Sequence, residues 1–550
     1  MRNMKSGRLQ KQKHRSIGQG QVLVLGVLIM VGIVALLGGV IDVGYLSLQQ
    51  QNLQGALDTA VKNGLSKVYA DGDDPLETVG TILAENVDLP CTIDAGGSGG
   101  GFDCSYGDVE VTVEDNTETA ECVDSVLTVT YPYNNDDLQL YAELTVPLRF
   151  LFYKLLESDE NTITVKSHAQ MTSDTSEWPS FQQNPPHTGE NEGTTFTPPL
   201  RKDWTYWALG RTRTQAVIHD GMVYFGAGTY LYALDARTGS FQWKTNVGLM
   251  DGCTPTVTGN RIYIGTNYGY DTVYCFNTSG GLVWSTRLRS IGTTAGLAVD
   301  GQYVYQQSSA DGALYVYDVN SGQPIQPNVP FPLPGGDPSY LNTGLPGPGG
   351  TGGFSTPALY AQKVHFATGD GNCMAYNIAG WTAAWATNLS GAGNLDSPLI
   401  YDGKLYYGGN SKVYCLDPNS GATLWTNTVG SRASSLAGAA GTVVVGTNSS
   451  VRAMDANTGA DLWSSGSNRY TVCAIAKGYV YSINAQSRKG LRIYSLSDGT
   501  ETQVLTDSLD AYYRDNGPAV GHGMVICPGN NTWKITAYTP LYPSQARLVE

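Results

Sequence analysis

The sequence predicts a mainly β protein in three parts: an N-terminal membrane helix, a small α+β domain and an eight-bladed β-propeller. Three observations predict this: an apolar run at residues 22–41, a composition rich in Gly and Tyr, and a turn motif that recurs through the second half. The expected boundaries are a basic tail at 1–21, a membrane helix at 22–41, a helix with a small α+β ectodomain at 42–170, a polar linker at 171–200, the propeller at 201–541 and a tail at 542–550.

The run VLVLGVLIMVGIVALLGGVI has the length of a membrane-spanning helix. Its 20 residues include no charged or strongly polar side chain, and at about 1.5 Å per residue they match the roughly 30 Å hydrocarbon core of a bilayer. Six basic residues and no acid precede it, so the N-terminus is expected in the cytoplasm and the bulk of the chain at the cell surface. A cleaved signal peptide is the alternative. The run is longer than is usual for one, and no small-x-small cleavage site follows it, which favours a retained single-pass anchor.

The composition predicts many short strands and argues against a nucleic-acid partner. Gly is abundant at 67 residues, charged residues make up only 15%, and 34 Tyr outnumber 11 Phe, a combination typical of many strands joined by tight turns. The net charge of −15 argues against a nucleic-acid partner, because affinity for phosphate backbones comes mostly from Lys and Arg. The basic tail suits contact with anionic membrane lipid.

The nine cysteines fall into two groups. The first three, Cys91, Cys104 and Cys122, lie in a polar, Gly-rich region where one bridge would help to hold a small domain; the sequence leaves open which two pair. The other six are predicted to be buried as small hydrophobic residues. No CxxC occurs and no His stands at metal-ligand spacing, so no metal site is predicted. These six are Cys253, Cys275, Cys373, Cys415, Cys473 and Cys527.

The stretch after the membrane run predicts a helix and then a small sheet. Apolar residues recur at spacings of three and four over residues 46–69, which predicts an amphipathic helix. A second helix is expected over 76–87 and strands over 109–113 and 126–131, with a Gly-rich loop at 95–103.

A turn motif repeats through the second half. The string Tyr232-Ala-Leu-Asp235-Ala-Arg-Thr238-Gly239 is followed by Trp243, and close copies end at Gly421 and Gly459. In such a hairpin turn the Asp side chain is expected to cap the backbone, while the Gly takes a positive φ. The recurring Trp is predicted to pack between blades. Weaker copies end at Gly280, Gly322 and Gly380.

The spacing of the motif predicts the blades of a propeller. The interval from Asp417 to Asp455 has the length of four short antiparallel strands with their turns. Eight units are expected, with starts near 214, 254, 293, 355, 396, 433, 471 and 515. The last unit lacks an outer strand, which residues 200–206 could supply. The interval from Asp318 to Asn377 is longer than the others because of a Pro/Gly-rich insertion. This insertion is either a binding loop or a neutral addition.

The N-terminal region resembles a known family. Residues 15–65 hold a basic leader with GQ, the apolar run, Asp42-Val-Gly44 and a Gln-rich helix, in that order. This region resembles the N-terminus of Flp/Tad pilus-assembly proteins of the TadG type. The resemblance implies a membrane-anchored, pilin-like protein that joins a Tad pilus or other envelope proteins.

The repeats resemble the PQQ-type β-propeller, the fold of quinoprotein dehydrogenases and of the assembly factor BamB. The run WPSFQQNPPHTG at 178–189 is similar to the segment that introduces many such propellers. The quinoprotein resemblance implies a quinone held between a Trp and a disulfide of adjacent cysteines, with Asp, Glu and Asn around calcium. No two cysteines are adjacent here, and no matching acidic set is found. No catalytic, cofactor or metal residue is therefore predicted, and the chain is predicted not to be an enzyme.

Together these observations predict a surface-exposed, Tad-associated membrane protein whose propeller binds a surface protein or glycan, for adhesion or as a scaffold. The expected partners are membrane lipid, Tad pilus or envelope proteins and such a ligand, without nucleic acid or cofactor. Two alternatives remain: a membrane-displayed, quinoprotein-like redox or sensory enzyme, and a BamB-like envelope assembly factor.

Overall fold

The computed structural model describes residues 47–68, 74–86, most strands between 91 and 171, and residues 174–548 with gaps, of which the longest are 288–294, 326–354 and 507–516. The chain divides into two compact units: the first comprises 1–172 and 545–550, and the second 173–544. The predicted membrane helix at 22–41 lies outside the described residues. Within the described residues, no helix has the length and apolar character needed to cross a membrane.

The first unit packs two helices on one sheet. Residues 47–68 are helical, and the predicted apolar stripe is buried, with Leu57, Val61 and Leu65 fully covered. These side chains share a core with α2 (Pro75–Asn86) and with strand residues of the sheet, Leu144 among them. This arrangement confirms the predicted amphipathic helix, because its apolar stripe needs a partner to cover it.

The sheet of the first unit is antiparallel and ordered β3-β4-β5-β6-β7-β39. A separate hairpin, β1 with β2, places Cys91 opposite Cys104. The final strand corrects the predicted tail at 542–550: residues 546–548 pair with residues 169–171 at the sheet edge. The strands are β1 (Cys91–Asp94), β2 (Gly101–Cys104), β3 (Glu110–Glu114), β4 (Thr117–Cys122), β5 (Ser125–Thr130), β6 (Gln139–Pro147), β7 (Thr162–Met171) and β39 (Ala546–Leu548).

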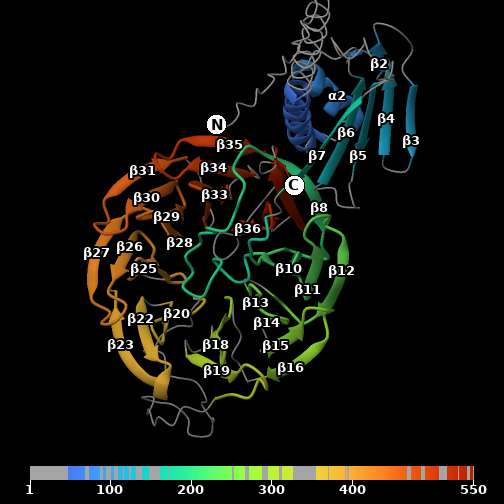
Figure 1. Cartoon of the computed structure of the whole chain (residues 1–550). Helices are drawn as coiled ribbons and strands as arrows, with labels where there is room; N and C mark the ends of the chain where they lie inside the picture. Colours follow the sequence, from blue (N-terminus) through green and yellow to red (C-terminus); the bar gives the residue numbers. More distant parts are fainter. Residues whose placement is uncertain are drawn as a thin grey trace, which may run out of the picture. The chain divides into compact units, whose positions relative to one another are not determined.

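The second unit is a ring of antiparallel sheets, which we call blades. Its described residues form eight sheets, seven of four strands and one of three. Figure 1 shows β13, β20, β28 and β36 toward the centre of the ring, and β12, β16, β23, β27 and β31 at its rim. The first strand of each blade is thus the inner one.

Blades 1 to 4 follow one another along the chain. In blade 3 the residues after β19 include the undescribed stretch 326–354, and only three strands are described. Blade 1 is β9 (Val217–His219), β10 (Met222–Ala227), β11 (Tyr230–Asp235) and β12 (Phe241–Asn246); blade 2 is β13 (Thr256–Thr258), β14 (Arg261–Gly265), β15 (Thr272–Asn277) and β16 (Leu282–Arg287); blade 3 is β17 (Ala298–Val299), β18 (Tyr303–Gln307) and β19 (Leu314–Asp318); blade 4 is β20 (Ala358–Tyr360), β21 (Lys363–Ala367), β22 (Asn372–Asn377) and, after the short 3₁₀ helix η2 (Ala379–Trp381), β23 (Thr382–Asn388).

Blades 5 to 8 complete the ring. Blade 8 takes its outer strand, β8, from the N-terminal side of the propeller, and this pairing confirms the predicted role of residues 200–206. Blade 5 is β24 (Leu399–Tyr401), β25 (Lys404–Gly408), β26 (Lys412–Leu416) and β27 (Thr423–Thr428); blade 6 is β28 (Ala433–Ala439), β29 (Thr442–Thr447), β30 (Val451–Asp455) and β31 (Asp461–Ser465); blade 7 is β32 (Ala474–Ala476), β33 (Tyr479–Ile483), β34 (Leu491–Ser495) and β35 (Glu501–Leu505); blade 8 is β36 (Ala519–Gly521), β37 (Met524–Gly529), β38 (Lys534–Pro540) and β8 (Leu200–Trp207).

The recurring turn joins the two outer strands of a blade, as predicted. In blade 1 an Asp235 carboxylate oxygen accepts hydrogen bonds from the Thr238 backbone N–H at 2.8 Å and the Thr238 hydroxyl at 2.7 Å. Gly239 follows with a φ of 68°, a conformation that a residue with a Cβ adopts only at a cost. The same carboxylate cap closes the turns at Asp318, Asp417 and Asp455.

The Trp of the outer strand in blades 1, 2, 4, 5 and 6 packs on the turn of the next blade. Trp243 donates its indole N–H to the carbonyl oxygen of Thr278 at 3.0 Å, and a Cβ added to Gly280 would lie 2.8 Å from the Trp243 ring. The turn glycine is therefore required twice, for its φ and for the close approach of the indole. The predicted inter-blade packing is confirmed, and the same contact joins Trp284 to Gly322, Trp385 to Gly421, Trp425 to Gly459 and Trp463 to Gly499.

Candidate binding pocket beside the strap

Residues 176–191, which we call the strap, cross the inner strands of the ring (Figure 1). The strap corrects the predicted polar linker at 171–200: its carbonyl groups accept hydrogen bonds from N–H groups of the inner strands and their turns, and Trp178 and Phe181 are buried. Within the described residues these bonds reach seven blades. The donor and acceptor pairs are Ile218 to Trp178, Val257 to Pro179, Leu359 to Pro185, Ile400 to Pro186, Gly438 to Thr188, Ile475 to Gly189 and His522 to Ser176.

Buried polar side chains fix the strap from within. The Gln182 backbone N–H donates to the Gln215 side-chain oxygen at 2.9 Å, and the Gln182 side-chain amide donates to the Leu436 carbonyl at 2.8 Å. Nδ1 of His187 lies 2.9 Å from the Pro398 carbonyl oxygen. Burial lowers the pKa of His187 to about 4, so the ring is neutral at pH 7. This histidine is therefore part of the packed strap.

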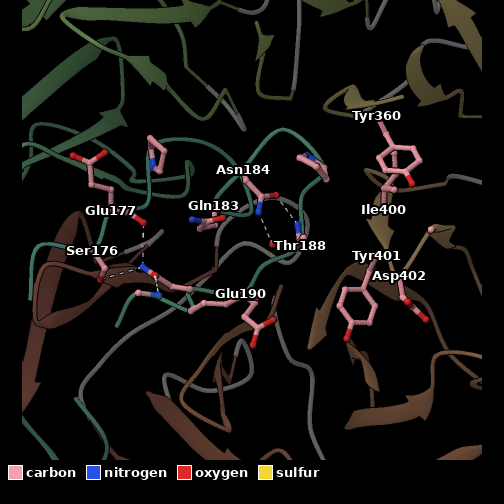
Figure 2. A pocket seen from close by; sticks show the side chains of 16 residues that line it. Ser176, Glu177, Gln183, Asn184, Thr188, Glu190, Tyr360, Ile400, Tyr401 and Asp402 are labelled. Carbon is pink, nitrogen blue, oxygen red and sulfur yellow. Dashed lines mark hydrogen bonds between the residues drawn. The ribbon is translucent and has the colours of Figure 1, made fainter. Parts of the chain in front are cut away.

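A pocket of about 690 Å³ lies between the strap and blades 4 and 5. Figure 2 shows strap residues such as Asn184 and Glu190 facing Tyr360, Ile400, Tyr401 and Asp402 across it. The facing residues come from β20, from β24 and from the turn after β24. The lining residues are Ser176, Glu177, Pro179, Gln183, Asn184, Pro186, Thr188, Glu190, Asn191, Glu192, Gly193, Tyr360, Ile400, Tyr401, Asp402 and Gly403.

The walls of the pocket are held by their own contacts. Tyr401 accepts a hydrogen bond on its hydroxyl oxygen from the Gly441 backbone N–H at 2.8 Å, and its ring lies so close to Gly438 that an added Cβ would stand 2.5 Å away. On the strap, the Asn184 amide donates to the Thr188 hydroxyl at 2.6 Å and accepts from the Thr188 backbone N–H at 2.9 Å. The pocket is therefore largely pre-formed.

Four carboxyl groups line the pocket, and two of them have basic partners. Glu177 pairs with His219 at 2.8 Å, and Asp402 pairs with Lys404 at 3.2 Å. No hydrogen bond or ion pair of the Glu190 or Glu192 side chain occurs among the residues that the structure describes. Partial burial, together with the nearby Glu192 charge, raises the pKa of Glu190 to about 7.

This arrangement has two chemical consequences. The two unpaired carboxylates attract a cation and repel an anion. Since its pKa is near neutral, Glu190 also holds or releases a proton under ordinary conditions. No residue of this site was predicted from the sequence. One signal was available: Glu190 and Glu192 alternate about Asn191, a spacing that points side chains to the same side of an extended chain.

Other titratable residues lie away from the pocket. His365 is fully buried in blade 4, where burial lowers its pKa to about 3. The six later cysteines are all buried, which confirms that prediction. In the described part of the chain, no three His, Cys, Asp or Glu residues come together as metal ligands. The quinone and calcium of a quinoprotein do not fit these residues, because the sequence also lacks adjacent cysteines.

The ring of radial antiparallel sheets, with indoles docked between them, defines a β-propeller protein. The chain belongs to the propeller family described as outer membrane protein assembly factor BamB, whose model matches residues 227–392 and again 369–506. A second model, described as putative Flp pilus-assembly TadE/G-like, matches residues 20–62. Both predicted resemblances are confirmed, and the chain is a pilus-associated or envelope β-propeller protein.

One curated relative is the tetrathionate hydrolase of Acidithiobacillus ferrooxidans, 24% identical over 283 residues. The match covers 49% of this chain and 47% of the hydrolase, so the chain spans about half the length of that relative. A quinohemoprotein alcohol dehydrogenase from Pseudomonas putida HK5 shares the fold with a TM-score of 0.53 at 13% identity, covering 68% of this chain and 81% of the dehydrogenase. A europium-containing methanol dehydrogenase has a TM-score of 0.53 at 11% identity, and the match covers 66% of this chain and 98% of the dehydrogenase.

These comparisons overturn one prediction. The chain was predicted not to be an enzyme, because it lacks the quinoprotein residues. The curated relative is nevertheless a hydrolase, whereas the two dehydrogenases show only that the fold is shared. The absence of one cofactor's residues does not decide the matter, since a fold carries many activities. An enzymatic function is therefore compatible with this chain.

Proposed function

We propose that this protein is a single-pass envelope protein that displays an eight-bladed propeller at the cell surface and binds a protein or glycan in the strap pocket. The Tad-like segment at 20–62 supports a role in an envelope or pilus assembly. The apolar run at 22–41, with its basic flank, supports an anchor with the N-terminus in the cytoplasm. In this role the propeller is the binding head of an adhesin or scaffold.

One observation carries the binding role: the pocket of about 690 Å³ has pre-formed walls and two carboxyl groups without partners in the described structure. Binding sites are typically concave, with apolar walls and a few placed polar groups. Tyr360, Tyr401 and Ile400 supply such walls, and Glu190 and Glu192 supply the polar groups.

Topology and binding are tested separately. A tag after Glu550 should be removed when intact cells are treated with protease, and a protected tag would contradict surface display. The full-length protein, purified in uncharged detergent, is then tested against envelope glycans and Tad pilus proteins. Tyr360→Ala removes one pocket wall and should abolish binding. Leu282→Ala, at a side chain 58% exposed on blade 2 and outside the pocket, should bind like wild type.

The hydrolase relative supports a second candidate, an enzyme that acts in the same pocket. A carboxyl group with a pKa near 7 is suited to general acid or base catalysis, and the pKa of Glu190 is raised to about 7. The negative charge of the site favours a neutral or cationic substrate over a dianion such as tetrathionate.

Hydrolysis assays of the full-length protein decide between the candidates. Tetrathionate is the first substrate, because the relative is named for it. If the pocket is the active site, Glu190→Gln should abolish turnover and Tyr360→Ala should slow it. Turnover unaffected by both variants would place the chemistry elsewhere in the chain.

A further inference from the structure

We propose that the strap pocket binds the lysine side chain of a protein partner. This inference rests on the proposed function and adds the chemical class of the ligand. It follows from which polar groups of the pocket already have partners, from the walls, and from the size of the cavity.

The charge of the pocket selects a cation. Glu177 and Asp402 already pair with His219 and Lys404, whereas Glu190 and Glu192 have no such partner in the described structure. Two neighbouring carboxylates repel each other, and an ammonium group placed between them relieves that repulsion. Glu190 is partly buried, whereas Glu192 is exposed. An ammonium paired with Glu190 is therefore less screened by water than an exposed surface pair.

The walls suit the stem of a lysine. Tyr360 and Tyr401 present aromatic rings to the cavity (Figure 2). Aromatic faces attract an ammonium group and also pack against methylene groups. A volume of about 690 Å³ accommodates a lysine side chain together with part of its backbone.

Two of the three amide side chains that line the pocket, those of Asn184 and Asn191, are already engaged and offer little to a glycan. Recognition of a sugar needs several directional hydrogen bonds from the site. The amide of Asn191 already donates to Ser176, Glu177 and Val520, and its oxygen accepts from the Gly193 N–H. The Asn184 amide is similarly engaged on both sides by Thr188. Among the described residues, Gln183 is then the one lining amide without a side-chain hydrogen bond, which is fewer directional groups than a sugar needs, while the carboxylates of Glu190 and Glu192 remain available.

Binding is tested by calorimetry on the full-length protein in uncharged detergent at pH 8. The probe is the peptide Gly-Gly-Lys-Gly-Gly, and the matched ligand carries acetyl-lysine, which has the same stem without the charge. Loss of a charged hydrogen bond weakens binding by about tenfold or more. The acetylated peptide should therefore bind at least about tenfold more weakly.

Variants assign the effect to the pocket. Glu190→Gln should weaken binding of the lysine peptide by about tenfold. Glu501→Gln, at an exposed carboxylate paired with Arg492 on blade 7, should bind like wild type. Wild-type affinity should fall between pH 8 and pH 6 as Glu190 gains a proton, since its pKa is raised to about 7, and Glu190→Gln should lose this pH dependence.

The outcomes separate this inference from the proposed function. Equal binding of the acetylated peptide overturns the cation assignment. Binding of a glucosamine oligomer in place of the lysine peptide overturns the protein assignment but leaves the pocket in use, provided that Tyr360→Ala abolishes it. If no ligand tested responds to Tyr360→Ala or Glu190→Gln, both the inference and the proposed function fail.

Discussion

The indole N–H of Trp204 donates a hydrogen bond to the carbonyl oxygen of Ala236 at 2.9 Å, although these residues belong to the last and the first blade of the ring. A Cβ on Gly239 would stand 2.5 Å from the same indole. The contact repeats the docking of the Trp residues of blades 1, 2, 4, 5 and 6, and it is made by the strand that enters blade 8 from the N-terminal side. Ring closure thus uses the same contact as these five blade junctions, whereas at the junction of blades 7 and 8 the side chain of Gln503 bonds to the backbone of Leu200.

Removing this indole should destabilise the ring. Trp204→Ala loses a packed aromatic side chain and should lower the free energy of unfolding by about 2–4 kcal/mol. Trp204→Phe keeps much of the ring but loses the N–H donor, and should cost about 1 kcal/mol. The control is Trp207→Ala, on the same strand but 67% exposed. Chemical denaturation is the measurement, and equal losses for the variants of Trp204 and Trp207 would contradict the closure role.

The charge of Glu190 should cost stability at high pH. Its pKa is raised to about 7 from 4.5, so the folded state binds more protons than the unfolded state between these values, and stability falls as the pH rises through this window. Glu190→Gln removes this loss. Its melting temperature should therefore exceed that of wild type more at pH 8 than at pH 5. A difference independent of pH would show that Glu190 titrates normally.

The turn carboxylates should respond in the opposite direction. Hydrogen bonds from the Ser420 backbone N–H lower the pKa of Asp417, so this group stabilises the fold above the unfolded pKa of about 3.9, and the effect is lost as the pH falls through its folded pKa. Asp417→Ala should be less stable than wild type at pH 7. Thermal melts at a series of pH values should show the gap closing below about pH 4.

The register of the first hairpin predicts a disulfide. Cys91 and Cys104 are directly opposite in antiparallel strands, where Cα atoms lie about 4.5–5.5 Å apart, within the range that disulfides span. Cys122 is opposite Ser125. Peptide mapping without reducing agent should link Cys91 to Cys104 and leave Cys122 open to alkylation. A bridge that includes Cys122 would show that this register is wrong.

Local features of the fold were predictable, and long-range ones were not. The Asp235 cap, the φ of Gly239 and the docking of Trp243 each depend on a few residues that recur with the repeat, so the sequence shows them. The strap was predicted as a linker because its composition is polar. The run WPSFQQNPPHTG indicated that a propeller follows, but not that this segment crosses it. Its course depends on hydrogen bonds between residues far apart along the chain, such as Thr188 and Gly438, which no local pattern shows.

The candidate site was missed for the same reason. Glu190 and Tyr401 belong to segments that are distant in the sequence, and only the folded ring brings them to one cavity. The missing quinoprotein residues also favoured the incorrect prediction that the chain is not an enzyme, which a hydrolase relative contradicts.

Photo-cross-linking in intact cells tests the central claim, that the strap pocket is where this protein meets its partner. A photoreactive phenylalanine is placed at Tyr360 in the pocket or, as a control, at Leu282 on blade 2. We expect a specific protein adduct from position 360, identified by mass spectrometry, that Glu190→Gln removes. Adducts of equal yield from both positions, or an adduct indifferent to Glu190→Gln, would contradict the account.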